Sequence, residues 1–106
     1  MNVLIESPFD ITDNNKKAIE EQTKELSVYN QGITNADIFF QEDDGVEANV
    51  ITARIQLRLP GPEIFASEAD QNYMKAFSLA LDKAERQLRK RKNIVQERHN
   101  PIPDIY

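Results

Sequence analysis

Cysteine is absent from this chain of 106 residues, and histidine and glycine are scarce, with one His and three Gly. The absence of cysteine excludes a disulfide framework, a thiol nucleophile and thiolate-ligated zinc. The single histidine, His99, excludes a histidine-based catalytic triad and a metal site built from several histidines. No phosphate-binding loop or dinucleotide fingerprint occurs among so few glycines. We therefore predict no catalytic residue, no metal ligand and no cofactor, and a protein that acts by binding.

Long apolar runs are also missing. No stretch approaches the roughly 20 apolar residues that a membrane span requires. The first ten residues, MNVLIESPFD, lack the basic n-region and the apolar run of a signal peptide. With 106 residues and 40% hydrophobic content, the sequence predicts one folded cytoplasmic domain without a membrane partner.

Positive charge is in deficit overall but is concentrated in one segment. The chain has 13 Lys and Arg against 18 Asp and Glu, a net charge of −5, which argues against indiscriminate binding of nucleic acid. Residues 83–92 carry six cations and one anion, Glu85, so their local charge is +5 and the remainder carries −10. Such a chain can present one basic face to RNA while the rest of its surface stays acidic.

The segment 70–92 has the periodicity of a long two-faced helix. Its apolar arc follows the i, i+3, i+4, i+7 rule and consists of Tyr73, Ala76, Phe77, Ala80, Leu81, Ala84 and Leu88. A second stripe beside that arc consists of Lys75, Leu79, Lys83, Arg86 and Lys90. The small alanines favour close packing on a sheet, because a free-standing coiled coil would need Leu or Ile there.

The basic end of this helix has two interpretations. Asp82 with Arg86 and Glu85 with Arg89 are favourable i, i+4 pairs, and cations in a last turn complement the helix dipole. On that interpretation the end is only a solvated helix terminus. However, no acid interrupts the run 89–92, and charge blocks of this kind are often anion-binding surfaces.

The rest of the chain predicts one more helix. Thr12 stands where an N-cap belongs, and the helix that follows should run to about Tyr29, with Gly32 as its break. The residues expected to face inward are Ile19, Leu26 and Tyr29, with Ala18 and Thr23 filling in.

Four segments have strand character. They are Asn2–Glu6, 36–41, 51–59 and 63–68. Asp44–Gly45 predicts a hairpin turn between the second and third strands, and Pro60–Gly61–Pro62 a turn before the fourth. The third strand alternates strictly, and its polar face carries Arg54 and Arg58.

The order β-α-β-β-β-α predicts an α+β fold, a two-layer sandwich in which both helices cover one face of a four-stranded sheet. We assign residues 1–92 to this domain. Residues 93–106 contain two prolines and little periodicity, and we expect an extended or mobile tail.

Three segments resemble the ribosome hibernation-promoting factors, also called ribosome-associated inhibitors or sigma-factor modulation proteins. Residues 9–19, FDITDNNKKAI, with Leu26 and Tyr29 after them, are similar to the first helix of that family. Residues 63–67, EIFAS, and 81–88, LDKAERQL, are similar to its last strand and second helix. The resemblance covers about residues 1–92, and the chain resembles the short class, without a C-terminal dimerisation domain.

This resemblance implies a fold similar to double-stranded-RNA-binding domains. It also implies a non-enzymatic inhibitor that binds the small ribosomal subunit, with its 16S rRNA, near the decoding centre and obstructs messenger RNA and transfer RNA when growth stops. No small-molecule substrate is implied. The positions carried over as rRNA-binding are Lys83, Arg86, Lys90 and Lys92. Further candidate cations are Lys75, Arg89 and Arg91 on the same helix, Lys16 and Lys17 on the first helix, and Arg54 and Arg58 on the third strand.

The sequence leaves two other functions open. In the first, the protein is an adapter that binds other proteins through the acidic hairpin 42–45 and the tail. In the second, it is a small α+β enzyme of the acylphosphatase type, which needs an anion-binding loop after the first strand. The segment 7–10, Ser-Pro-Phe-Asp, does not provide such a loop.

Overall fold

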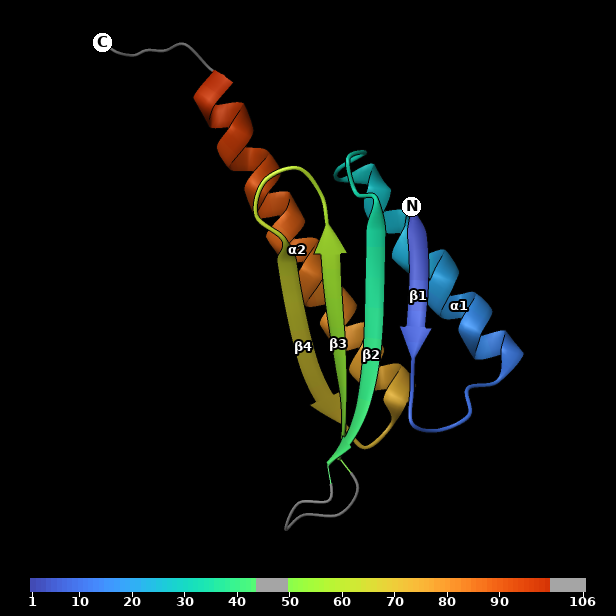
Figure 1. Cartoon of the computed structure of the whole chain (residues 1–106). Coiled ribbons are helices and arrows are strands. Elements are labelled where there is room, and N and C mark those ends of the chain that lie inside the picture. The colour runs from blue at the N-terminus through green and yellow to red at the C-terminus, as the bar shows by residue number, and fades with distance from the viewer. Residues whose placement is uncertain (44–49, 100–106) are drawn as a thin grey trace.

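The structure is a computed structural model that describes residues 1–43 and 50–99. The elements in chain order are strand β1 (Asn2–Glu6), helix α1 (Asp13–Lys24), the short 3-10 helix η1 (Glu25–Val28), strands β2 (Asn35–Asp43), β3 (Val50–Arg58) and β4 (Ile64–Asp70), and helix α2 (Tyr73–His99). Figure 1 shows them as one sheet backed by two helices. The predicted order β-α-β-β-β-α is confirmed.

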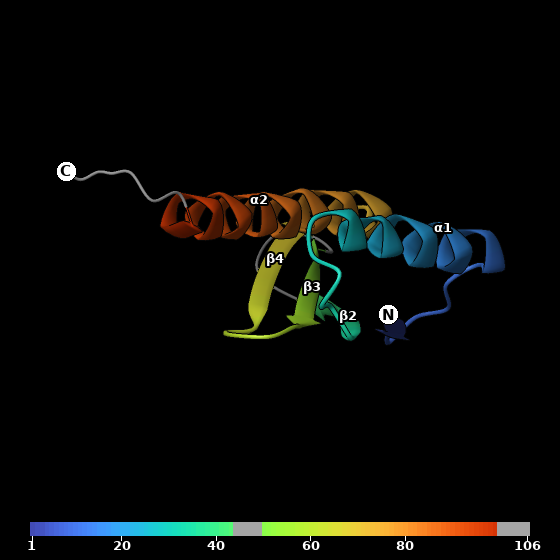
Figure 2. The same cartoon turned by 90° about the horizontal axis from the view of Figure 1, so that it is seen from above.

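The four strands lie in the order β1-β2-β3-β4. β1 pairs with β2 in parallel, while the β2–β3 and β3–β4 pairs are antiparallel. Parallel neighbours need a crossover, and α1 supplies it between β1 and β2. Both helices cover the same face of the sheet, as Figure 2 shows, so the α+β fold with two helices on one face is confirmed.

The core lies between the sheet and the helices. Ala53, Ile55 and Leu57 of β3 are completely buried, as the alternation of the third strand predicts. Ala76 and Ala80 of α2 are equally buried. Because their side chains are small, α2 lies close over β3 and β4, and its rotation about its own axis is fixed by this packing.

Helix α1 begins as predicted, with the Thr12 Oγ1 accepting a hydrogen bond from the Asn15 N–H at 3.2 Å. Its end differs from the prediction, because the α-helix stops at Lys24 and continues as the 3-10 turn η1. Ser27 Oγ donates to the Lys24 carbonyl at 2.8 Å and thereby competes for an acceptor of the last turn, where 3-10 geometry is common. The predicted inward residues Ile19, Thr23 and Leu26 are buried.

Gly32 has a different role from the predicted one. Its backbone is not left-handed, and among the glycines of the described chain only Gly61 has a positive φ, of 89°, in the predicted turn. A Cβ atom at position 32 would lie 2.8 Å from Cδ of Pro60. Glycine is therefore needed there for space beside the β3–β4 turn, and not as a helix C-cap.

Helix α2 is longer than predicted. It extends past Lys92 to His99, so the first part of the expected extended tail is helical. The physical reason is in the sequence: residues 93–99, NIVQERH, contain no glycine or proline, and the first helix-breaking residue is Pro101. The rest of the predicted tail, 100–106, and the Asp44–Gly45 turn lie outside the described residues. Within the described chain, neither helix combines the length and apolarity needed to cross a membrane.

Candidate nucleic-acid interface

The first turn of α2 is fixed by capping and by an aromatic cluster. Asn72 Oδ1 accepts hydrogen bonds from the backbone N–H groups of Met74 at 2.9 Å and Lys75 at 3.2 Å, which satisfies two free donors of the helix start. The ring of Tyr73 lies 5.0 Å from that of Phe9 and 5.6 Å from that of Phe40, between their centroids. These contacts fix where the basic stripe begins.

A row of side chains one turn apart ties α2 to the edge of β4. Lys83 Nζ donates to the carbonyl of Ser67 at 3.4 Å, Gln87 Nε2 to the carbonyl of Phe65 at 2.9 Å, and Arg91 Nη2 to the carbonyl of Pro62 at 2.6 Å. We call Lys83, Gln87 and Arg91 the edge row. Lys83 also lies 3.7 Å from the Glu68 carboxylate. Two of the predicted rRNA-binding cations are therefore held at the margin of the sheet.

The other exposed cations of the stripe point away from the sheet. They are Lys75, Arg86 and Lys90, and we call them the outer stripe. At 100° per residue they fall within an arc of about 60°, and Lys75 and Lys90 are about 22 Å apart along the axis. Within residues 1–43 and 50–99, no ion pair within 4.0 Å involves any of the three. A phosphate could therefore contact these three cations without displacing a carboxylate of the described chain.

The two predicted i, i+4 ion pairs have different outcomes. Arg89 lies 4.0 Å from the Glu85 carboxylate, so that pair is confirmed. Asp82 and Arg86 form no ion pair in the described part of the chain, so the second prediction is wrong. Both side chains are accessible to solvent, and holding them together would restrict their rotamers for little gain in water. Arg86 thus belongs to the outer stripe, while Arg89 is partly neutralised.

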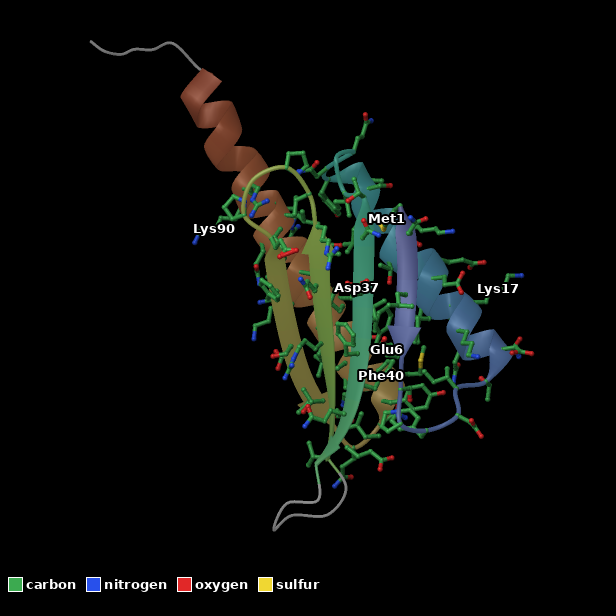
Figure 3. The ribbon with its side chains drawn as sticks, in the orientation of Figure 1. Met1, Glu6, Lys17, Asp37, Phe40 and Lys90 are labelled. Carbon is green, nitrogen blue, oxygen red and sulfur yellow. The ribbon has the colours of Figure 1, made fainter. Side chains whose placement is uncertain are left out.

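The predicted lysines of α1 do not join the outer stripe. Lys16 and Lys17 are exposed on α1, which packs beside β1, whereas α2 packs on β3 and β4. Figure 3 shows Lys17 and Lys90 on opposite sides of the molecule. Lys92 belongs to α2, but its side chain lies outside the described part.

The two strand arginines lie on the uncovered face of the sheet. Arg58 is 3.5 Å from the Glu63 carboxylate, whereas exposed Arg54 has no ion-pair partner among the described residues. Next to Arg54 is a groove of about 580 Å³ whose lining includes Phe39, Phe65 and the edge-row residue Lys83. Neither phenylalanine was among the residues predicted from the sequence. The available signal was an aromatic residue at an outward position of a strand, since Phe65 stands between the inward Ile64 and Ala66.

The described residues contain no cluster of three or more His, Cys, Asp or Glu side chains that could hold a metal ion. The outer stripe and the groove on the uncovered sheet face together present cations, aromatic rings and an amide. Cations bind phosphate, and aromatic rings stack on bases, so this combination suits RNA.

Comparisons with known proteins agree with this chemistry. Residues 6–96 match the family model described as "Sigma 54 modulation protein / S30EA ribosomal protein". No curated protein matches the chain in sequence. Two similar solved structures are a ribosomal subunit interface protein from Coxiella burnetii and the N-terminal domain of Protein Y from Thermus thermophilus.

The two structures align over most of the chain. The Coxiella protein is 22% identical with a TM-score of 0.75, and the alignment covers 88% of this chain and 99% of that one. The Thermus domain is 27% identical with a TM-score of 0.69, and the alignment covers 85% of this chain and 98% of that one. The Coxiella likeness supports the fold alone.

Proposed function

Because this chain belongs to the sigma 54 modulation protein / S30EA ribosomal protein family, we propose that it is a ribosome hibernation factor that binds the small ribosomal subunit. It contacts 16S rRNA near the decoding centre and obstructs the sites of messenger RNA and transfer RNA. The action is steric and needs no catalytic group. Its place of action is the cytoplasm, where ribosomes are found.

The outer stripe is the observation that carries this proposal. Lys75, Arg86 and Lys90 have no ion-pair partner in the described chain, and they lie on a helix whose rotation is fixed by buried alanines. In a protein of net charge −5, such a stripe concentrates positive potential on one side of α2, where phosphates can bind. The family match over residues 6–96, to a model named for a ribosomal protein, supports a ribosomal partner.

The length of α2 supports an obstructive role. A helix of 27 residues is about 40 Å long, and it projects beyond the end of the sheet in Figure 1. A rigid rod with cations along one side can lie along an RNA surface and exclude a second RNA from the same space.

Sedimentation through a sucrose gradient tests the proposal. Purified protein is mixed at low salt with small subunits, large subunits or whole ribosomes, and each gradient fraction is probed for the protein. We expect it to sediment with small subunits and whole ribosomes and to remain at the top with large subunits. Recovery at the top of all three gradients would refute the proposal.

The dependence of ribosome binding on salt distinguishes this proposal from the rival interpretation, in which the protein is an adapter that binds other proteins. Binding through phosphate contacts weakens steeply as ionic strength rises, whereas a largely apolar protein interface does not. Binding to ribosomes that is unchanged between about 50 and 200 mM salt would favour the adapter. Of the acidic hairpin 42–45 on which that interpretation depends, residues 44 and 45 lie outside the described residues.

A further inference from the structure

The uncovered face of the sheet carries large apolar side chains that nothing in the described chain covers. Leu4 is 50% exposed and Phe65 is 56% exposed, while the helices occupy the opposite face. Scattered exposed apolar residues are ordinary on protein surfaces. Phe65 is different because the strand register places it beside a second aromatic ring and two cations.

The register of three strands assembles this neighbourhood. Phe39 of β2 is opposite Arg54 of β3, which is opposite Ser67 of β4. In an adjacent row on the same face, Gln56 is opposite Phe65. From the spacing of strands and of residues along them, the Cα atoms of Phe39 and Phe65 are about 12 Å apart. The groove of about 580 Å³ lies here, and its lining includes both rings, Arg54 and Lys83.

The lining of the groove is cationic and partly apolar, and the carboxylates beside it, Glu63 and Glu68, are bound to Gln56 and Lys83. Its lining contains two cations and no acidic residue, although the whole chain is acidic. Lys83 is held at the rim by the Ser67 carbonyl and the Glu68 carboxylate, and Arg54 has no ion-pair partner among the described residues. This charge favours an anion, and the two rings favour a flat apolar group.

Gln56 adds a polar group to the floor of the groove. Its Nε2 donates to both carboxylate oxygens of Glu63, at 3.3 and 3.1 Å, which orients the amide. The Oε1 atom then remains as an acceptor, with no donor among the described residues. A base carries amino or imino groups that can donate to such an acceptor.

We infer that this groove binds an unpaired nucleotide of single-stranded RNA. The base stacks on Phe65, with Phe39 as the second wall of the groove, while Arg54 and Lys83 contact the adjoining phosphates. The inference deepens the proposed function and rests on it for the source of the RNA. On this inference the uncovered face of the sheet binds RNA by base stacking, whereas the outer stripe contacts only phosphates.

Tryptophan fluorescence tests the inference directly, because the chain contains no tryptophan. Phe65→Trp places one fluorophore in the groove, and Leu4→Trp places one at the far strand of the same face as a matched control. Each variant is titrated with single-stranded hexauridylate and with an RNA duplex of six base pairs. We expect hexauridylate to quench the fluorescence of Phe65→Trp and not that of Leu4→Trp. The duplex should quench neither variant, because its bases are already stacked.

A second measurement tests whether the aromatic ring of Phe65 itself contributes to the affinity for hexauridylate. Phe65→Leu removes the aromatic ring but keeps an apolar side chain, while Phe65→Tyr keeps the ring. We expect Phe65→Leu to weaken hexauridylate binding by about five- to hundredfold and Phe65→Tyr to preserve it. Circular dichroism should be unchanged in both, because the side chain is mostly exposed.

The outcomes distinguish this inference from the proposed function. The nucleotide site would be overturned by equal quenching of the two tryptophan variants, by no quenching of Phe65→Trp, or by undiminished binding to Phe65→Leu. If hexauridylate quenches Phe65→Trp but the protein does not sediment with ribosomes, the nucleotide site stands and the proposed function fails. If the protein sediments with ribosomes and Phe65→Trp is not quenched, the proposed function stands and the nucleotide site fails.

Discussion

Removal of the outer stripe should change how ribosome binding depends on salt. The variant replaces Lys75, Arg86 and Lys90 with Gln, which keeps the side chains long and is well tolerated in helices. All three point away from the packed face of α2, so the fold should be unaffected. If each cation neutralises one phosphate, the slope of log K against log salt should become shallower by about 2 to 3.

That slope change corresponds to a measurable difference in affinity. Between about 50 and 200 mM salt, the unaltered protein should lose about 16- to 64-fold more affinity for small subunits than the variant. The assay is a co-sedimentation titration with purified small subunits at several potassium chloride concentrations and a constant magnesium concentration. Circular dichroism and the melting temperature verify that the variant is folded.

A matched control separates the position of the charges from their number. Replacing Lys16, Lys17 and Lys24 of α1 with Gln changes the net charge by the same amount, on a helix beside the opposite edge of the sheet. We expect this control to retain nearly the full salt slope. Equal slopes in both variants would show that total charge matters and that the outer stripe has no special role.

Three further predictions concern the scaffold and are measured by urea or thermal unfolding. Phe77→Ala should lower the free energy of unfolding by about 3 to 5 kcal/mol, since this completely buried ring would leave a cavity; a loss below about 1 kcal/mol would show that the core can collapse around it. Gly32→Ala should cost about 1 to 3 kcal/mol because the new methyl group would lie 2.8 Å from Pro60 Cδ, and unchanged stability would mean that the proline ring moves aside easily. Tyr73→Phe should cost about 1 kcal/mol, because the hydrogen bond from the Asn15 amide to the phenol oxygen is lost, and Asn15→Ala should then add little to the loss in the double variant.

Local periodicity was enough to predict most of the elements. The spacing of Ala76, Ala80 and Ala84 predicts the buried arc of α2, and the alternation around Ile55 predicts the buried face of β3. The end of α2 was harder to predict, because residues 93–99 lack strong periodicity and yet contain nothing that stops a helix. Helix ends depend on weak local competition, as the change to 3-10 geometry after Lys24 also shows.

The candidate site was only partly predictable, for a different reason. The cations of the outer stripe share one helix, so their common side follows from spacing within a single segment. The groove combines Phe39, Arg54 and Phe65 from three strands. Their proximity depends on strand order and register, which no local pattern specifies. Likewise, nothing in the spacing of Lys83 indicates that its amine meets a backbone carbonyl of β4.

The edge row has a consequence for assembly. An outer strand presents unpaired backbone groups on which another chain can extend the sheet, and exposed edges of this kind lead to aggregation and domain swapping. On β4, the carbonyls of Phe65 and Ser67 are already occupied by Gln87 and Lys83. A second strand could pair there only by displacing these side chains. Edge-to-edge addition at this margin of the sheet therefore has to break two hydrogen bonds that the folded chain already makes, which disfavours pairing there when copies of the protein are crowded together.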